Sequence, residues 1–180
     1  MANFYGTTSA GGASNLGTIF KVTPAGALTT LHAFTGADGS GPVAAPVMGK
    51  GGNFYGTTCG FNAPWTAYSI TSMVVFTTVN QATPPCSFAP FAVGNDGTLY
   101  GTSQAGGLTY QGTVFRMTPA GAITVLSNFD YTHGAYLYSP VVLGNDNLIY
   151  GTTSGGGSGQ GGVVFKMTLA GELCFCINSI

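Results

Sequence analysis

Charged side chains are scarce in this chain of 180 residues: four are basic and five are acidic, which is 5% of the sequence, against about 25% in ordinary globular domains. Four cations cannot neutralise a useful run of phosphates, so the composition excludes a nucleic-acid binder that works through a basic surface. No run of 18 apolar residues occurs, so the sequence predicts no membrane span. The 44% of hydrophobic residues suffice for a buried core, which argues against charge-driven disorder.

Cysteine is also rare, and the four cysteines lack the spacing of a zinc site. A disulfide between Cys59 and Cys86 is compatible with the sequence. The favoured interpretation is that these two, like Cys174 and Cys176, are free thiols that behave as small hydrophobic residues. The N-terminus has neither a basic segment nor an apolar core, so we expect no signal peptide in this chain.

A repeated motif is the strongest feature of the sequence. The segment 3–8, Asn-Phe-Tyr-Gly-Thr-Thr, recurs with substitutions at 53–58, 98–103 and 148–153. From one of its tyrosines to the next the spacing is 50, 45 and 50 residues. A second motif, which begins Gly-Thr-Ile-Phe-Lys and ends Thr-Pro-Ala-Gly, occupies 17–26 and recurs at 112–121 and 162–171. Self-similarity at this period indicates a repeat architecture.

Each repeat unit is predicted to contain four short strands. In the third unit β-branched and aromatic residues form the strands, and Gly, Pro, Asn and Asp separate them. No window has a convincing helical period, so we expect almost no helix. Four-stranded units of this length are typical of propeller blades. We therefore predict an all-β fold of the β-propeller type; the competing fold, a flat β-solenoid, has shorter coils.

The domain prediction is a single repeat domain, 1–180, with about 3.75 blades. The blades are expected at approximately 2–41, 42–89, 90–138 and 139–180. This number is too small to close a ring with most observed blade numbers, and an open set would expose apolar sheet faces. We therefore expect two chains to pair as a homodimer and complete a ring of seven or eight blades.

The second unit departs from the pattern. From Tyr55 to Phe76 is 21 residues, whereas 15 residues separate the tyrosine and phenylalanine of the other units. On this alignment 61–72 is an insertion in a long loop. Pro84 and Pro85 then fall where the outer strand should be, and proline cannot donate to a β-ladder. We therefore predict a short or missing outer strand in this blade.

Residues 97–121 carry a family resemblance. The run Gly-Thr-Leu-Tyr-Gly-Thr at 97–102 and the run Gly-Thr-Val-Phe-Arg-Met-Thr-Pro-Ala-Gly at 112–121 resemble the Gloeo/Verruco tandem repeat of secreted or surface bacterial proteins. The resemblance covers nearly all of the chain, is weakest in 59–90 and 174–180, and implies an extracellular or cell-surface location. It brings no catalytic signature with it.

The Asn-Asp-Gly turn before an aromatic strand is similar, more distantly, to blades of NHL and gluconolactonase-type propellers. Some members of that wider group are calcium-dependent lactone hydrolases. The resemblance implies a fold, and any activity follows from it by analogy alone.

The long connections of such blades emerge at one end and the tight hairpins at the other. Long loops on a rigid scaffold are where sites are built, so the long-loop end is the candidate functional face. The residues of interest expected there are Asp38, Trp65, Tyr68, Tyr110, Asp130, Tyr131, His133 and Tyr136. His32 is expected to be structural, and Asp96 and Asp146 are expected to serve turn geometry at the opposite end.

Three of these residues form the candidate catalytic set: His133 as general base on a water, with Asp130 and Tyr131 beside it. Asp38 and Asp130, with loop carbonyls, are candidate oxygen ligands for Ca²⁺. Such a cation beside a carbonyl would stabilise the oxyanion formed when an ester or lactone opens. The structural alternative is a loop-capping aspartate and an exposed histidine.

Aromatic residues on the same face are candidates for substrate binding. Trp65, Tyr68 and Tyr110 could form a platform on which a sugar stacks, although packing between blades explains the tyrosines equally well.

The sequence leaves two functions open. The first, favoured narrowly, is a calcium-assisted hydrolase of a small lactone or ester. The alternative is a non-catalytic surface module that binds glycan or self-associates, which the low density of reactive side chains favours.

Overall fold

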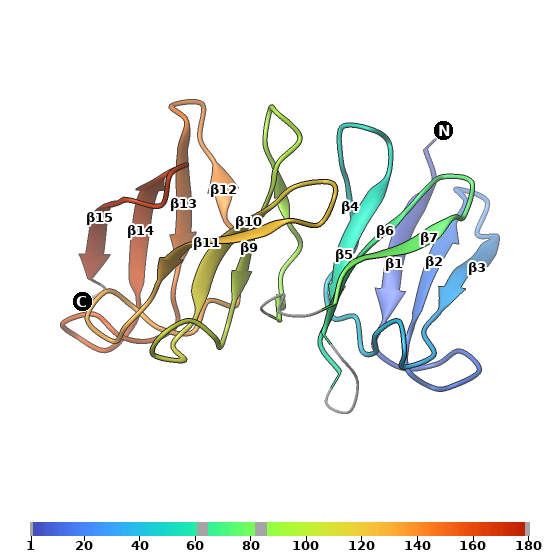
Figure 1. Ribbon diagram of the computed structural model, residues 1–180, viewed down its shortest axis with the longest axis horizontal. Helices are drawn as coiled ribbons and strands as arrows, with labels where there is room; N and C mark the ends of the chain where they lie inside the picture. Colours follow the sequence, from blue (N-terminus) through green and yellow to red (C-terminus); the bar gives the residue numbers. More distant parts are fainter. Residues whose placement is uncertain (1, 61–64, 82–85, 179–180) are drawn as a thin grey trace. The chain divides into compact units, whose positions relative to one another are not determined.

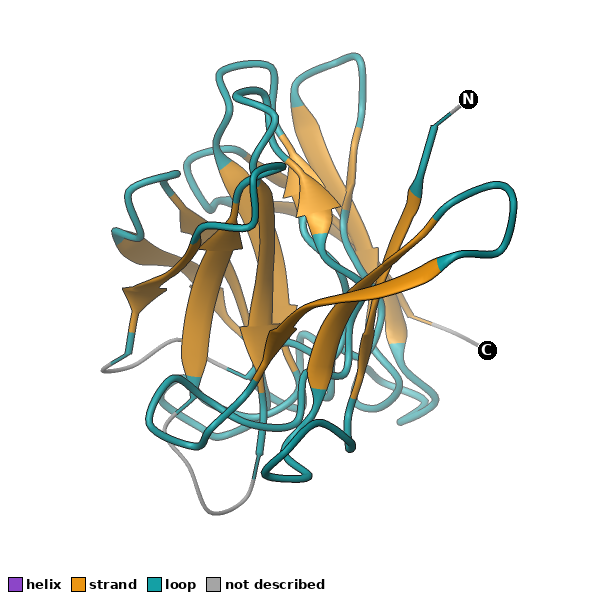
Figure 2. Ribbon diagram, turned by 90° about the vertical axis from the view of Figure 1, so that its right-hand side faces the viewer, coloured by secondary structure: helices purple, strands orange, loops and turns teal. Residues whose placement is uncertain are grey.

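The computed structural model describes residues 2–60, 65–81 and 86–178, and in these it contains 15 β-strands and no helix (Figures 1 and 2). The strands form four antiparallel sheets, one of three strands and three of four. Each sheet corresponds to one sequence repeat. We call the four sheets blades 1 to 4, in chain order. The predicted all-β fold with four-stranded units is confirmed.

The strands within a blade follow one another in sequence order. Blade 1 contains β1 (Phe4–Thr8), β2 (Thr18–Val22) and β3 (Leu28–Ala33). Blade 2 contains β4 (Val47–Met48), β5 (Phe54–Thr58), β6 (Thr66–Ile70) and β7 (Phe76–Asn80). Blade 3 contains β8 (Ala92–Val93), β9 (Leu99–Ser103), β10 (Thr113–Met117) and β11 (Ile123–Asn128). Blade 4 contains β12 (Val142–Leu143), β13 (Leu148–Thr152), β14 (Val163–Thr168) and β15 (Leu173–Asn178).

The chain divides into two compact units, each of which we describe by itself. Unit 1 is Met1–Pro84, with blades 1 and 2, and unit 2 is Pro85–Ile180, with blades 3 and 4. Each unit has its own buried cluster: Ile19, Phe34, Phe54, Tyr68 and Ile70 in unit 1, and Tyr100, Val114, Phe129, Leu137, Val141, Ile149, Phe165 and Met167 in unit 2.

The Tyr-Gly-Thr motif recurs because its glycine lies opposite an aromatic ring. In every blade this glycine pairs with an aromatic residue of the next strand, and a Cβ at the glycine would overlap that ring. The pairs are Gly6 with Phe20, Gly56 with Tyr68, Gly101 with Phe115 and Gly151 with Phe165.

The tyrosine of the motif has a repeated environment as well. In the three four-stranded blades, the tyrosine pairs with the first residue of the first strand, which is β4, β8 or β12. These pairs are Tyr55 with Val47, Tyr100 with Ala92 and Tyr150 with Val142. The repeat in the sequence is therefore a repeat of packing.

The outer strand of blade 2 is present and has five residues, against six in the other blades, so the prediction that it could be missing is wrong. Tyr68, not Phe76, lies opposite Gly56, so Tyr68 takes the place that phenylalanine has in the other blades. From Tyr55 to Tyr68 is 13 residues, so the connection is shortened rather than lengthened. Phe76 begins the outer strand β7, which ends at Asn80, before the two prolines. Pro84 and Pro85 lie outside the described residues.

The turns of blade 2 confirm this new alignment. The N–H of Thr71 donates to the carbonyl of Val75 (3.0 Å), as that of Thr23 donates to Ala27 (3.0 Å). Val74 thereby takes the position of Gly26 and adopts its left-handed conformation, with φ of 67° against 84°.

No helix in the described part of the chain is long and apolar enough to cross a bilayer. Completion of a ring by a second chain stays a prediction.

Candidate functional site

The long-loop ends of blades 1, 3 and 4 share one loop conformation. Their glycine-rich loops each contain a non-glycine residue with a left-handed backbone: Asn15, Tyr110 and Gln160, with φ of 54°, 57° and 57°. Each loop is closed by a bond between glycines, such as Gly17 N–H to Gly11 O (3.1 Å) and Gly162 N–H to Gly156 O (3.0 Å). Tyr110 is 76% exposed at its loop, on the predicted face of unit 2.

The connections that follow β3 and β11 also match position by position. Phe34 and Phe129 begin them, and both donate their N–H to the equivalent glycine carbonyl at 3.0 Å. Asp38 and His133 therefore occupy equivalent positions, as do Thr35 and Asp130. In both connections a side chain closes the turn by bonding across three residues.

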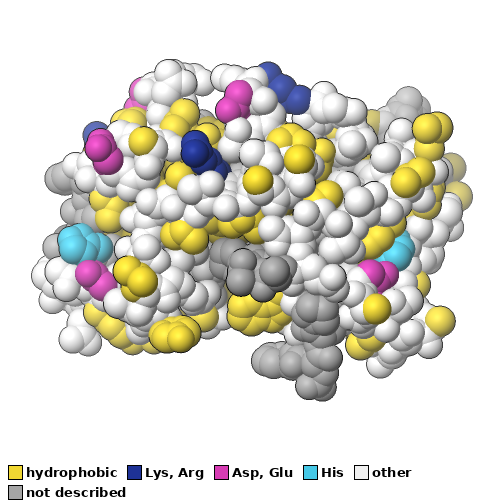
Figure 3. Space-filling model, viewed as in Figure 1, with side chains coloured by type: hydrophobic (Ala, Val, Ile, Leu, Met, Phe, Trp, Pro, Cys, Tyr) yellow, Lys and Arg dark blue, Asp and Glu magenta, His cyan; other side chains and the backbone are white. Residues whose placement is uncertain are grey.

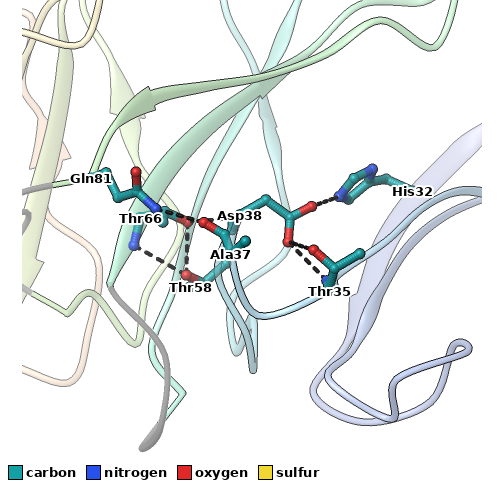
Figure 4. Close-up of polar contacts among 7 residues, drawn as sticks. All are labelled: His32, Thr35, Ala37, Asp38, Thr58, Thr66 and Gln81. Atoms are coloured by element: carbon teal, nitrogen blue, oxygen red, sulfur yellow. Dashed lines mark hydrogen bonds and ion pairs between the residues drawn. The ribbon is translucent and has the colours of Figure 1, made fainter.

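In blade 1 the turn holds Asp38 against two partners (Figure 4). Its Oδ1 accepts the N–H and the hydroxyl of Thr35 (2.8 and 2.9 Å), and its Oδ2 lies 2.8 Å from Nε2 of His32. Burial opposes ionisation of Asp38, but the hydrogen bonds from Thr35 and His32 outweigh it and lower the pKa of this carboxyl. His32 also stacks on Phe76, with ring centroids 3.7 Å apart. His32 is thus packed in the structure, as expected.

In blade 3 the carboxylate stands at the first position of the turn, and the histidine stands at the position that Asp38 has in blade 1. Oδ1 of Asp130 accepts the backbone N–H of His133 (2.8 Å) and lies 2.8 Å from Nδ1 of the same residue. The backbone bond from His133 is the main cause that lowers the pKa of Asp130. The side chain of His133 is 55% exposed, and within the described structure its Nε2 has no hydrogen-bond partner. In Figure 3 each of the two cyan histidines lies against a magenta acidic side chain.

Two tyrosines distinguish the blade 3 connection from that of blade 1. Tyr131 and Tyr136 stand where blade 1 has Gly36 and Gly41. Their hydroxyl oxygens are 2.7 Å apart and their rings are perpendicular. Tyr136 keeps the left-handed backbone of Gly41, with φ of 62° against 59°, a conformation that costs a residue with a side chain about 1 kcal/mol. The hydrogen bond with Tyr136 raises the pKa of Tyr131.

An open hollow of about 630 Å³ adjoins this connection. Tyr131 and Thr132 form one side of it, and the glycine-rich loop of blade 4 forms the other. The lining residues are Tyr131, Thr132, Gly157, Ser158 and Gln160. The tyrosine pair and this hollow were missed as a unit by the sequence analysis, although alignment of the repeats reveals the exchange of two glycines for two tyrosines.

The remaining predicted residues are not part of this arrangement. Tyr68 is fully buried in β6, so its placement on the loop face is wrong; the misaligned second repeat had assigned a strand to a loop. Trp65 is 43% exposed just before β6, in unit 1. Asp96 and Asp146 accept N–H groups in their turns, which confirms the expected role in turn geometry.

The two predicted calcium ligands each belong to a hydrogen-bonded turn. Asp38 and Asp130 belong to different units, and each carboxylate already accepts hydrogen bonds from a histidine or its neighbours. Among the residues that the structure describes, no three His, Cys, Asp or Glu side chains gather as a metal site requires. We therefore derive no chemistry through a cation, and calcium stays a prediction.

Electrostatics separates the two ends of the blades. All four basic residues lie at or next to the tight hairpins: Lys21, Lys50, Arg116 and Lys166. The long connections contain Asp38 and Asp130 and no lysine or arginine. Their charge therefore favours neutral or cationic molecules over anionic ones.

Two of the cysteines differ from the favoured interpretation. Cys59 and Cys86 are disulfide-bonded rather than free, because pairing depends on the spatial approach of Cβ atoms, which spacing in the sequence does not reveal. Cys174 is a free, exposed thiol, and the side chain of Cys176 lies outside the described residues.

Comparison with known proteins adds the family. Residues 61–178 match the model of the Gloeobacter/Verrucomicrobia repeat. The chain belongs to this repeat family. A search of curated proteins found no significant match.

Solved structures resemble the repeat protein in fold. Virginiamycin B lyase from Staphylococcus aureus has 18% identity and a TM-score of 0.66, over 97% of this chain and 55% of the lyase. A streptogramin B lyase has 18% identity and a TM-score of 0.63, over 94% of this chain and 52% of that one. A putative gluconolactonase has 10% identity and a TM-score of 0.58, over 94% and 62%. The chain thus spans about half the length of the lyases, and the likeness confirms the propeller-type fold alone.

Proposed function

We propose that this chain is part of a propeller hydrolase that opens a small, neutral lactone or ester at residues 130–136 of unit 2. The observation that carries the proposal is the exchange in blade 3, where a histidine held by Asp130 and a bonded tyrosine pair replace the Asp38 and glycines of blade 1. The fold likeness to a putative gluconolactonase and to two lyases adds an analogy.

His133 would act as the general base. With Asp130 at its Nδ1, the imidazole carries its proton there and Nε2 is left as acceptor. Nε2 takes a proton from water while the water oxygen forms a bond to the carbonyl carbon of the substrate. The carbon–oxygen single bond of the ester then breaks, and the imidazolium returns the proton to the leaving alkoxide. One water is consumed, and a lactone gives one hydroxy acid.

The tyrosine pair supplies a hydrogen-bond donor to the oxyanion. One hydroxyl donates to the other across 2.7 Å, so the second hydroxyl keeps its own hydrogen for an external acceptor. The raised pKa of Tyr131 keeps this residue protonated at neutral pH. The absence of lysine and arginine from the long connections suits an uncharged substrate.

The test measures hydrolysis of γ- and δ-lactones and of p-nitrophenyl acetate by the purified chain. We expect His133→Ala to lower kcat about 100-fold or more, because general-base catalysis contributes about 10²–10⁴. Asp146→Asn, an exposed aspartate at a hairpin, is the matched control and should keep full activity. Equal rates for wild type, His133→Ala and Asp130→Ala would reject this site.

Two further measurements refine the outcome. In ¹⁸O-labelled water a hydrolase incorporates the label into the acid product, whereas an unlabelled product with a new carbon–carbon double bond identifies a lyase and refutes hydrolysis. Treatment with EDTA, followed by addition of Ca²⁺, tests the calcium prediction separately, and activity that is lost and then restored by Ca²⁺ supports it.

The disulfide-bonded Cys59 and Cys86 support a location in an oxidising compartment, and we propose that the protein is secreted or at the cell surface. Pairing of two chains is proposed with it, since an open set of blades leaves sheet edges exposed.

A further inference from the structure

A second cavity lies in unit 2 at the end of the blades that carries the tight hairpins. The proposed hydrolase site lies on the long connections instead. The cavity has a volume of about 240 Å³. Its walls come from the β8–β9 turn, the β12–β13 turn and the turn that follows β14. The lining of this hairpin-end pocket includes Asp96, Tyr100, Leu143, Asn147, Leu148 and Leu169.

The turns around the pocket are held by short hydrogen bonds. Gly94 N–H donates to Thr98 O (2.7 Å), and Gly144 N–H donates to Leu148 O (2.8 Å). Gly97 and Asn147 adopt the left-handed backbone that such turns require, with φ of 88° and 60°. The pocket is therefore built from two preformed hairpins, which lowers the ordering cost of binding.

Tyr100 has an unpartnered hydroxyl in this pocket. In blade 4 the equivalent Tyr150 donates to Oδ2 of Asp146 (2.7 Å). In blade 3 the equivalent oxygen of Asp96 instead accepts the hydroxyl of Thr98 (2.7 Å), because blade 4 has Leu148 where blade 3 has Thr98. Tyr100 is only 3% exposed, it lines the pocket, and among the described residues its hydroxyl has no hydrogen-bond partner.

Tyr100 lines the pocket, and its hydroxyl is not among the fully buried unpartnered atoms. A ligand that accepts its hydrogen bond therefore replaces the water that the hydroxyl would otherwise bind. Burial and the nearby Asp96 raise the pKa of Tyr100 against the opposite influence of Arg116. The hydroxyl is therefore protonated and a donor at neutral pH. Asp96 is the charged residue of the pocket lining, so the pocket disfavours anionic ligands.

The lining also contains apolar side chains. Leu143, Leu148 and Leu169 contribute them, and Leu169 stands where the matching turns of blades 1 and 3 have Pro24 and Pro119. A cavity of 240 Å³ is smaller than the roughly 300–1,000 Å³ of sites for drug-sized ligands. The size of the cavity and its lining of leucines and hydrogen-bonding groups match a pyranose ring, which has an apolar C–H face and hydroxyls at its edge.

We infer that the hairpin-end pocket binds one neutral sugar unit, with its C–H face on the leucines and a hydroxyl or ring oxygen as the acceptor for Tyr100. This inference is independent of the proposed hydrolase, because it uses the other end of the blades. Glycan binding was the alternative function that the sequence left open, and this inference gives it a specific place.

The experiment is an NMR titration of the ¹⁵N-labelled chain with methyl glycosides of glucose, galactose and mannose and with N-acetylglucosamine. Concentrations reach about 100 mM, since a pocket of this size is expected to give Kd values in the millimolar range. We expect amide shifts at Gly94, Gly144 and Leu148 with at least one sugar. Tyr100→Phe, which keeps the ring, should weaken that sugar about tenfold, the effect of one hydrogen bond.

Tyr150→Phe is the matched control, because its hydroxyl binds Asp146 and it does not line the pocket. It should leave the sugar affinity unchanged. The inference is overturned if no sugar shifts the pocket amides, if the shifts are confined to residues 130–136, or if Tyr100→Phe binds as tightly as wild type.

Discussion

Tyr68 provides the sharpest test of the repeat packing. It is fully buried, lies opposite Gly56, and its hydroxyl has no hydrogen-bond partner among the described residues. The equivalent residues are phenylalanine in the other three blades: Phe20, Phe115 and Phe165. Tyr68→Phe therefore removes one unsatisfied oxygen and leaves the ring against Phe34 and Phe76.

The expected effect is an increase in the free energy of unfolding. A buried hydroxyl without a partner costs about 1–3 kcal/mol, and loss of one oxygen's packing contacts offsets a small part of it. We expect Tyr68→Phe to stabilise the protein by about 1–2 kcal/mol, which raises Tm by about 2–4 °C per kcal/mol in a chain of this size.

The dependence of folding stability on pH, above neutral pH, provides a second readout. Burial raises the pKa of Tyr68 far above its ordinary value of 10. The unfolded chain therefore releases this proton first as pH rises, and folding stability falls above about pH 10. Tyr68→Phe cannot ionise and should lose less stability between neutral pH and about pH 11 than wild type.

The assay is urea unfolding followed by circular dichroism and by the fluorescence of Trp65. The reverse exchange, Phe115→Tyr in blade 3, is the internal control and should destabilise by about 1–3 kcal/mol. The reasoning is refuted if Tyr68→Phe destabilises the protein and loses as much stability as wild type between neutral pH and about pH 11. In that case the hydroxyl has a partner.

Two other predictions concern backbone strain and acid stability. Val74 has the left-handed φ of 67° where blade 1 has Gly26, so Val74→Gly should raise the free energy of unfolding by about 1 kcal/mol in a urea titration, and Gly26→Val should lower it; a destabilised Val74→Gly contradicts the strain. Hydrogen bonds from Thr35 and His32, which outweigh burial, lower the pKa of Asp38, so its contribution exists above about pH 4 and is lost as pH falls through the folded pKa. Tm measured from pH 7 to pH 2 should therefore fall less in Asp38→Asn than in wild type, and parallel curves argue against this contribution.

The structure of a single blade follows from local features of the sequence. Its period, the glycine opposite an aromatic residue and the turn residues are local features, because antiparallel neighbours within a blade are joined by short connections. The pairing of Asp130 with His133 was foreseeable for the same reason, since the two residues are three apart in one turn.

Tertiary structure decided what depends on residues distant in the chain. Blade 2 was misread because Tyr68 replaces a phenylalanine and its loop is two residues shorter, so that only the pairing with Gly56 reveals the register. The disulfide bonds of Cys59 and Cys86 and the hairpin-end pocket likewise depend on which segments meet. A sequence repeat specifies the unit, whereas the contacts between units follow from the packing of whole sheets.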